Sequence, residues 1–121
     1  DAGNANNNWV ARSNSTGSTG TGPGSDHTSG SGNYIFLEAS SCLNDTAVML
    51  SQGLDLSGLS TPELSFYYHM YGATNMGTID LELSDDDGDT WTSIWSQSGN
   101  QGNTWLDVNL DISSFVENLY P

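Results

Sequence analysis

Apolar and polar residues alternate along the stretch from Pro62 to Trp95. In its first limb every second position is apolar, at Leu64, Phe66, Tyr68 and Met70, and a later limb repeats the pattern at Ile79, Leu81 and Leu83. Successive side chains leave a pleated strand on opposite faces, so a period of two predicts half-buried β-strands. A third limb, residues 90–95, follows the turn residues DDDGD. We predict a three-strand antiparallel meander whose apolar face packs on another layer.

Four further stretches have strand character: residues 9–12, 33–39, 46–51 and 104–112. The last of them alternates again, and its predicted inward residues are Leu106, Val108, Leu110 and Ile112. No helical pattern reaches the length of an ordinary helix, and residues 113–119 predict only a brief helical turn. Seven short strands with turn-rich gaps predict a single all-β domain over residues 1–121, an antiparallel two-sheet β-sandwich or jelly roll.

The charge balance narrows the range of partners. The 121 residues include one basic residue, Arg12, and 15 acids, which gives a formal net charge of −14. Nucleic-acid binding needs cationic groups that neutralise phosphates, so the composition argues against nucleic acid and, equally, against anionic membrane surfaces. No apolar run approaches the roughly 20 residues of a membrane span. The acidity suits a cation-rich exterior, although a merely soluble acidic surface would explain it as well.

The single cysteine, Cys42, cannot form a disulfide within this sequence. Either it pairs with a cysteine outside the sequence or it packs as a small apolar side chain.

The polar stretch of residues 13–32 contains Asp26 within the run GPGSDHT. We predict a long loop that this carboxylate holds in place. A carboxylate among glycines and serines offers the hard oxygen ligands that Ca²⁺ prefers, and Glu38 on the adjoining strand is the expected second ligand. The alternative is that Asp26 caps the turn by accepting hydrogen bonds from backbone N–H groups.

Residues 84–91, SDDDGDTW, fit the pattern S-x-D-x-G-x-T-W and resemble the Asp-box hairpin of sialidase propellers. Ser84 is the first residue of this motif. We expect Asp86 to accept hydrogen bonds from backbone N–H groups, Gly88 to take a left-handed conformation and Trp91 to pack beneath the turn. In that resemblance the motif is structural. The alternative, a Ca²⁺ loop, lacks the acidic twelfth residue of an EF-hand.

Groups suited to catalysis are sparse. His27 and His69 are the only histidines, and neither stands in a nucleophile motif, so we expect no enzymatic activity. Tyr67, Tyr71 and Trp105 alternate against the inward positions and form a candidate surface for protein partners or sugar rings. In a sandwich, coverage of these rings by the second sheet is the competing interpretation.

Three separated motifs resemble the MAM domain of extracellular proteins: GTGPGSDHTSGSGNYIFLEAS at 20–40, LSFYYHMYG at 64–72 and WSQSGNQGNTW at 95–105. The resemblance covers about residues 9–111. It implies a jelly-roll β-sandwich that acts as a non-catalytic accessory module of secreted or cell-surface proteins. Such modules associate with other protein chains or with neighbouring domains, and some relatives hold a cation near the loop that contains Asp26.

The chain departs from the family pattern in two ways. Animal members use several cysteines, whereas this chain has one, and its composition is more similar to that of modules on bacterial secreted proteins. The family pattern also continues beyond Pro121 into an Asp-rich strand. We therefore expect an incomplete domain, with further segments or a partner contributing that strand.

Three functions compete on this basis. The first is an extracellular interaction and adhesion module with a structural calcium ion. The second is a carbohydrate-binding accessory domain of a secreted enzyme. The third, a fragment of a sialidase-like propeller, would need a second copy of the Asp-box motif, which the sequence lacks.

Overall fold

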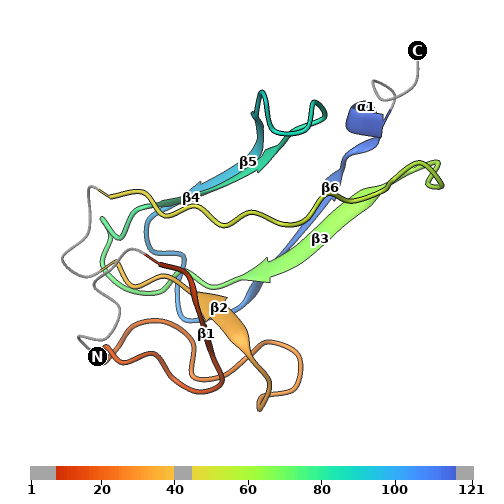
Figure 1. Cartoon of the computed structure of the whole chain (residues 1–121). Helices are drawn as coiled ribbons and strands as arrows, with labels where there is room; N and C mark the ends of the chain where they lie inside the picture. Colours follow the sequence, from red (N-terminus) through yellow and green to blue (C-terminus); the bar gives the residue numbers. More distant parts are fainter. Residues whose placement is uncertain (1–7, 40–44, 117–121) are drawn as a thin grey trace.

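The computed structural model describes residues 8–39 and 45–116, which contain six short β-strands and one helical turn (Figure 1). The strands are β1 (Val10–Arg12), β2 (Tyr34–Phe36), β3 (Glu63–Tyr68), β4 (Thr78–Leu83), β5 (Thr92–Ser98) and β6 (Leu106–Asp111), and the helical turn is α1 (Ser113–Val116). The predicted all-β class is confirmed. The predictions for Cys42, for the ends of the chain and for the rest of the terminal helical turn lie outside the described residues.

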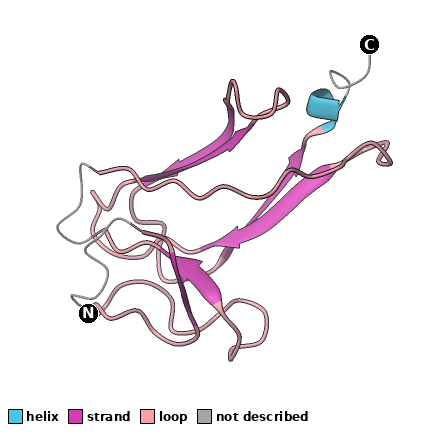
Figure 2. Cartoon of the chain, viewed as in Figure 1, coloured by secondary structure: helices cyan, strands magenta, loops and turns pink. Residues whose placement is uncertain are grey.

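The strands pair antiparallel in three two-stranded sheets, β1–β2, β3–β6 and β4–β5 (Figure 2). The β3–β6 register places apolar residues opposite one another, as in Leu64 with Leu110 and Phe66 with Val108. Both strands alternate between half-buried and exposed residues, as their sequence pattern predicts. This arrangement agrees with an antiparallel β-sandwich, and its jelly-roll topology stays a prediction.

The predicted three-strand meander is wrong, because β3 pairs with β6 and not with β4. The connection after β3 is hydrogen-bonded to other segments and does not turn back on its own strand. The Gly22 N–H donates to the Tyr71 carbonyl at 2.9 Å, and the Gln101 N–H donates to the Met70 carbonyl at 2.6 Å. Met70 itself is only 2% exposed. These bonds carry the chain away from the edge of β3, where β6 takes the neighbouring position.

Trp95 of β5 connects the two larger sheets. Its ring meets Phe66 and Tyr68 of β3 edge to face, with ring centroids 5.1 and 4.9 Å apart. Such aromatic pairs add stability beyond the area that they bury. A register shift between Leu81 and Glu82 marks a bulge in the β4–β5 ladder. Bulges re-aim side chains, and here Ile94 and Trp95 are both half-buried although they are consecutive.

Residues 46–51 do not form the predicted strand, and no strand lies between β2 and β3 in the described part of the chain. Val48, Met49 and Leu50 are 74%, 54% and 67% exposed, so neither face of this extended stretch is covered. Exposed apolar residues continue at Leu54 and Leu59. We refer to residues 46–59 as the apolar segment; it is the yellow trace that crosses Figure 1 toward the start of β3. Its strand-like sequence pairs with no strand among residues 8–39 and 45–116.

Replacing Trp95 tests the connection between the sheets. We expect Trp95→Ala to lower the free energy of unfolding by about 3 kcal/mol, because a cavity replaces the ring that contacts Phe66 and Tyr68. Urea unfolding followed by circular dichroism measures this change. Trp95→Phe keeps an aromatic ring and serves as the matched control, with a loss of about half that size. Equal, small losses in both variants would show that the sheets do not depend on this contact.

Candidate functional site

The loop between β1 and β2 approaches the rest of the fold through Gly22, where any other residue would be strained. Gly22 has a φ of +62°, and a Cβ added there would lie 2.6 Å from the Thr16 side chain. Its N–H is the group that donates to the Tyr71 carbonyl. The glycines of this polar stretch therefore permit a close backbone contact that attaches the loop to the connection after β3.

Asp26 organises the second half of this loop. Its Oδ2 accepts hydrogen bonds from the N–H groups of Thr28 and Ser29 at 3.1 and 2.8 Å, and its Oδ1 accepts one from the Gly32 N–H at 2.8 Å. The Ser29 hydroxyl lies 3.2 and 3.1 Å from the two oxygens. These donors, the Ser29 N–H above all, lower the pKa of Asp26 below its usual 3.8. The prediction that Asp26 holds the loop in place is confirmed.

The same hydrogen bonds occupy the oxygens with which Asp26 would bind Ca²⁺. A carboxylate offers about four lone-pair positions, and N–H and O–H donors surround both Asp26 oxygens. Glu38 accepts a hydrogen bond from the Ser18 hydroxyl at 3.0 Å. Within residues 8–39 and 45–116, no group of three or more His, Cys, Asp or Glu side chains could hold a metal ion. The carboxylates as placed do not form a calcium cage, and calcium at Asp26 and Glu38 stays a prediction.

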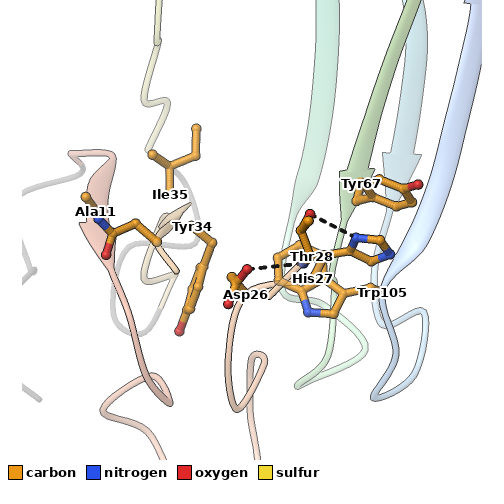
Figure 3. Close-up of a pocket in the computed structure, with 9 residues that line it drawn as sticks. Ala11, Asp26, His27, Thr28, Tyr34, Ile35, Tyr67 and Trp105 are labelled. Carbon is orange, nitrogen blue, oxygen red and sulfur yellow. Dashed lines mark hydrogen bonds between the residues drawn. The ribbon is translucent and has the colours of Figure 1, made fainter. Parts of the chain in front are cut away.

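A pocket of about 380 Å³ lies between this loop, β2 and β3 (Figure 3). In the close-up, Ile35 and Tyr34 stand on one side of Asp26, and His27, Trp105 and Tyr67 stand on the other. Pockets of this size are at the lower end of those that bind small ligands. The pocket therefore combines aromatic walls with one carboxylate.

Hydrogen bonds and ring contacts fix the aromatic walls. The Trp105 indole N–H donates to the Ser25 carbonyl at 3.1 Å, and the Tyr34 hydroxyl donates to the Asn14 carbonyl. Tyr34 and Trp105 meet edge to face at 5.9 Å. His27 stacks on Tyr67 with a centroid distance of 3.4 Å and an interplanar angle of 12°. The rings are positioned by the fold before any ligand arrives.

The structure separates the three aromatic residues that the sequence singled out. Tyr67 is 51% exposed and lines the pocket together with Trp105, which is half-buried. Trp105 also has edge contacts with two histidine rings, so it is an inner wall and not an open platform. Tyr71 is half-buried and contacts His69, outside the pocket lining.

Sequence reasoning missed that both histidines pack against Trp105, at centroid distances of 6.2 Å for His27 and 5.4 Å for His69. The His69 Nε2 lies 3.2 Å from the Asn103 side-chain oxygen, and its Nδ1 is buried with no hydrogen-bond partner among the described residues. Burial lowers the pKa of His69, which favours the neutral ring. One signal was present in the sequence: His69 follows Tyr67 by two positions in the alternating pattern, although β3 itself ends at Tyr68.

The hairpin between β4 and β5 is closed by side chains of its own. Asp86 accepts hydrogen bonds from the Thr90 N–H at 2.8 Å and from the Thr90 hydroxyl at 2.6 Å. The Ser84 hydroxyl donates to Asp86 and accepts a bond from the Gly88 N–H at 2.8 Å. Gly88 has a φ of +91°, and the Trp91 indole N–H donates to its carbonyl at 3.2 Å. Side-chain hydrogen bonds thus link both ends of the turn.

Comparisons with known proteins point to one family. The family model described as "MAM domain, meprin/A5/mu" matches residues 1–120. The chain is 36% identical over 100 residues to neuropilin-1a of Danio rerio, a match that covers 80% of this chain and 11% of that protein. It is 34% identical over 107 residues to MAM domain-containing protein 2 of Homo sapiens, covering 87% of this chain and 15% of that protein.

A third relative is MAM domain-containing glycosylphosphatidylinositol anchor protein 1 of Homo sapiens, 39% identical over 98 residues, or 77% of this chain and 10% of that protein. The chain thus spans between 10% and 15% of the length of these relatives. They are vertebrate proteins, so the greater similarity to bacterial modules stays a prediction. No solved structure gives a significant match. Among the described residues there is no helix that is long and apolar enough to cross a bilayer.

The Asp86 network predicts a pH dependence of the hairpin. Hydrogen bonds from the Thr90 hydroxyl and N–H lower the pKa of Asp86 from 3.8 to about 2. A depressed folded-state pKa contributes stability that is fully present above 3.8 and is lost as the pH falls through about 2. NMR titration of the Asp86 carboxyl carbon should give a midpoint near 2, and Asp86→Asn should abolish the matching shift of the Thr90 amide. A midpoint near 3.8 would contradict the network.

Proposed function

The chain belongs to the MAM domain family, and from that membership we propose that it is a non-catalytic interaction and adhesion module of a secreted or cell-surface protein. Neuropilin and the glycosylphosphatidylinositol-anchored MAM protein are extracellular or cell-surface proteins, which supports an extracellular location. Its partners in this proposal are other protein chains or neighbouring domains.

The apolar segment carries this proposal. Three consecutive large apolar residues, Val48 to Leu50, are more than half exposed, and Leu54 and Leu59 extend the series. Contiguous exposed apolar surface of this kind marks interaction sites. An extended stretch with no ladder partner among the described residues also offers backbone donors and acceptors to an added strand. We infer that a strand of another polypeptide segment pairs here and covers these side chains.

Charge restricts the identity of that segment. Asp45 precedes the exposed apolar residues and Asp55 lies among them, between Leu54 and Leu59. The chain as a whole carries a formal charge of −14, with Arg12 as its one basic residue. Pairing two copies through this segment would bring like charges together, which disfavours self-association. The proposed partner is therefore a neutral or basic segment of a different sequence.

The geometry around the histidines supports a non-catalytic role. The His27 Nδ1 lies 3.4 Å from the hydroxyl of its neighbour Thr28, yet the Asp26 oxygens accept bonds from backbone N–H groups and from Ser29. A catalytic triad needs a carboxylate that orients the histidine, and no hydrogen bond joins Asp26 to His27 in the described structure.

Carbohydrate binding is the second candidate function, and the exposure of Tyr67 supports it. A sugar ring would stack on an aromatic face beside polar groups. His27 already covers one face of Tyr67, and Trp105 and Tyr71 are half-buried, so the three rings do not form a broad platform. The interaction module is the better-supported proposal for this reason.

A photo-crosslinking residue at position 49 tests the proposed interface. We expect crosslinks to another polypeptide segment when the chain is expressed in its native extracellular setting, because Met49 lies in the middle of the apolar segment. The matched control places the same residue at the exposed Trp91 on the β4–β5 hairpin, where we expect none. Leu50→Asp should reduce the crosslink yield and change the free energy of unfolding by less than about 0.5 kcal/mol. Crosslinks at Trp91 alone would contradict the proposal.

A structural calcium ion is the untested part of the proposal, with Asp26 and Glu38 as its carboxylate ligands. Binding would require Asp26 to give up hydrogen bonds that it now accepts from the N–H groups of Thr28 and Ser29. A bound ion would stabilise the native state by mass action. We expect Ca²⁺ to raise the melting temperature by several degrees in the wild type and in Asp86→Asn, but not in Asp26→Asn. A melting temperature that is identical in Ca²⁺ and in excess EDTA would remove calcium from the proposal.

A further inference from the structure

We propose that the pocket beside Asp26 binds the guanidinium group of an arginine side chain that a protein partner presents. This inference rests on the proposed interaction function and names the chemistry of one contact. It concerns a surface separate from the apolar segment, because none of residues 46–59 line the pocket.

The walls of the pocket suit a planar cation. Tyr34, Tyr67 and Trp105 line it together with His27, which stacks on one face of Tyr67. The ring faces that His27 does not cover attract a positive charge through their negative potential. Arginine gains more from such walls than lysine, because its guanidinium group is flat, weakly hydrated and able to stack on aromatic rings. The bonds of Trp105 to Ser25 and of Tyr34 to Asn14 hold two of the three rings in place. A ligand therefore loses little affinity to ordering the site.

Asp26 supplies the complementary charge. It is 9% exposed, it lines the pocket, and the donors of the loop keep it ionised at neutral pH. Its oxygens already accept hydrogen bonds, so its contribution to a ligand is the Coulomb attraction of a carboxylate in a partly enclosed site. A guanidinium group gains the charge–charge attraction of this carboxylate, which a neutral sugar lacks.

The chain does not fill the pocket with its own cation. Arg12 is its one basic residue; its Nε donates to the Ser15 carbonyl at 2.7 Å and its guanidinium carbon lies 5.7 Å from the centre of the Phe36 ring. Arg12 is not among the residues that line the pocket. The proposed cation comes from outside this sequence, and the formal charge of −14 favours the approach of a basic partner. A volume of about 380 Å³ has room for one long side chain.

NMR titration of the ¹⁵N-labelled chain tests the site with small probes. The probes are N-acetyl-arginine methylamide, the lysine analogue, the neutral citrulline analogue, and two sugars, glucose and N-acetylglucosamine. We expect the arginine probe to shift the Trp105 indole N–H signal with a saturable curve, and the citrulline probe to bind at least about tenfold more weakly. Tyr67→Ala should weaken arginine binding about five- to tenfold, because one wall is lost from an exposed position. Trp91→Ala is the matched control and should leave binding unchanged.

Several outcomes would overturn the inference. Equal binding of citrulline would show that the charge is irrelevant, and shifts confined to residues 85–89 would show only general attraction to an acidic hairpin. A sugar that shifts the Tyr67 and Trp105 signals where arginine does not would assign the pocket to carbohydrate. The absence of any signal shift with every probe would also reject the proposed guanidinium site. None of these results affects crosslinking at position 49, so failure of this inference is distinguishable from failure of the proposed function.

Discussion

The edge-to-face packing of Trp95 on Phe66 and Tyr68 is the contact on which the larger part of the fold depends. In the described part of the chain each of the three sheets has two strands, and an isolated two-stranded sheet is at best marginally stable in water. The β3–β6 and β4–β5 ladders gain stability by facing each other across this aromatic contact. Among the described residues, few large apolar side chains are deeply buried, with Met70, Ile112 and Tyr34 below 9% exposure, so this aromatic contact is a large part of the packing that the structure shows.

The third sheet is attached through polar bonds and one aromatic pair. Tyr34 of β2 meets Trp105, the residue before β6, and Trp105 in turn bonds the loop at Ser25. Asp26 fixes that loop from within, and the bond of the Gly22 N–H to the Tyr71 carbonyl fixes it from outside. The pocket thus lies where this loop, the β1–β2 sheet and the β3–β6 sheet meet. Its shape depends on the same few bonds that attach β1 and β2 to the rest of the protein.

Local sequence patterns predicted the strands well but not their partners. Alternation placed Leu64, Phe66 and Leu110 on the inward faces correctly, because side-chain direction is a property of each strand alone. Pairing of β3 with β6 depends on bonds made far away in the sequence, and residues 46–51 had a strand's pattern without a strand's neighbour. A strand forms only where an alternating sequence also has a neighbouring strand with which to pair.

The candidate site was predictable to a similar extent. The role of Asp26 in its loop followed from a lone carboxylate among glycines and serines. The stacking of His27 on Tyr67, and the position of Trp105 between two histidines, did not follow, because the loop and β3 meet only in the folded chain. Exposure also cannot be read from alternation alone: Tyr67 is open, whereas Trp105 is enclosed.

The nesting of one ladder inside another also constrains how the chain assembles. Glu63 pairs with Asp111, and the whole β4–β5 hairpin lies between them in the sequence. Closing a long loop costs more entropy than closing a short one, and a hairpin that forms first shortens the loop that remains. The turn from Ser84 to Thr90 supplies its own hydrogen bonds, so this hairpin needs no help from the outer strands to begin. Folding from the middle of the sequence outward is therefore the order with the lowest cost of loop closure.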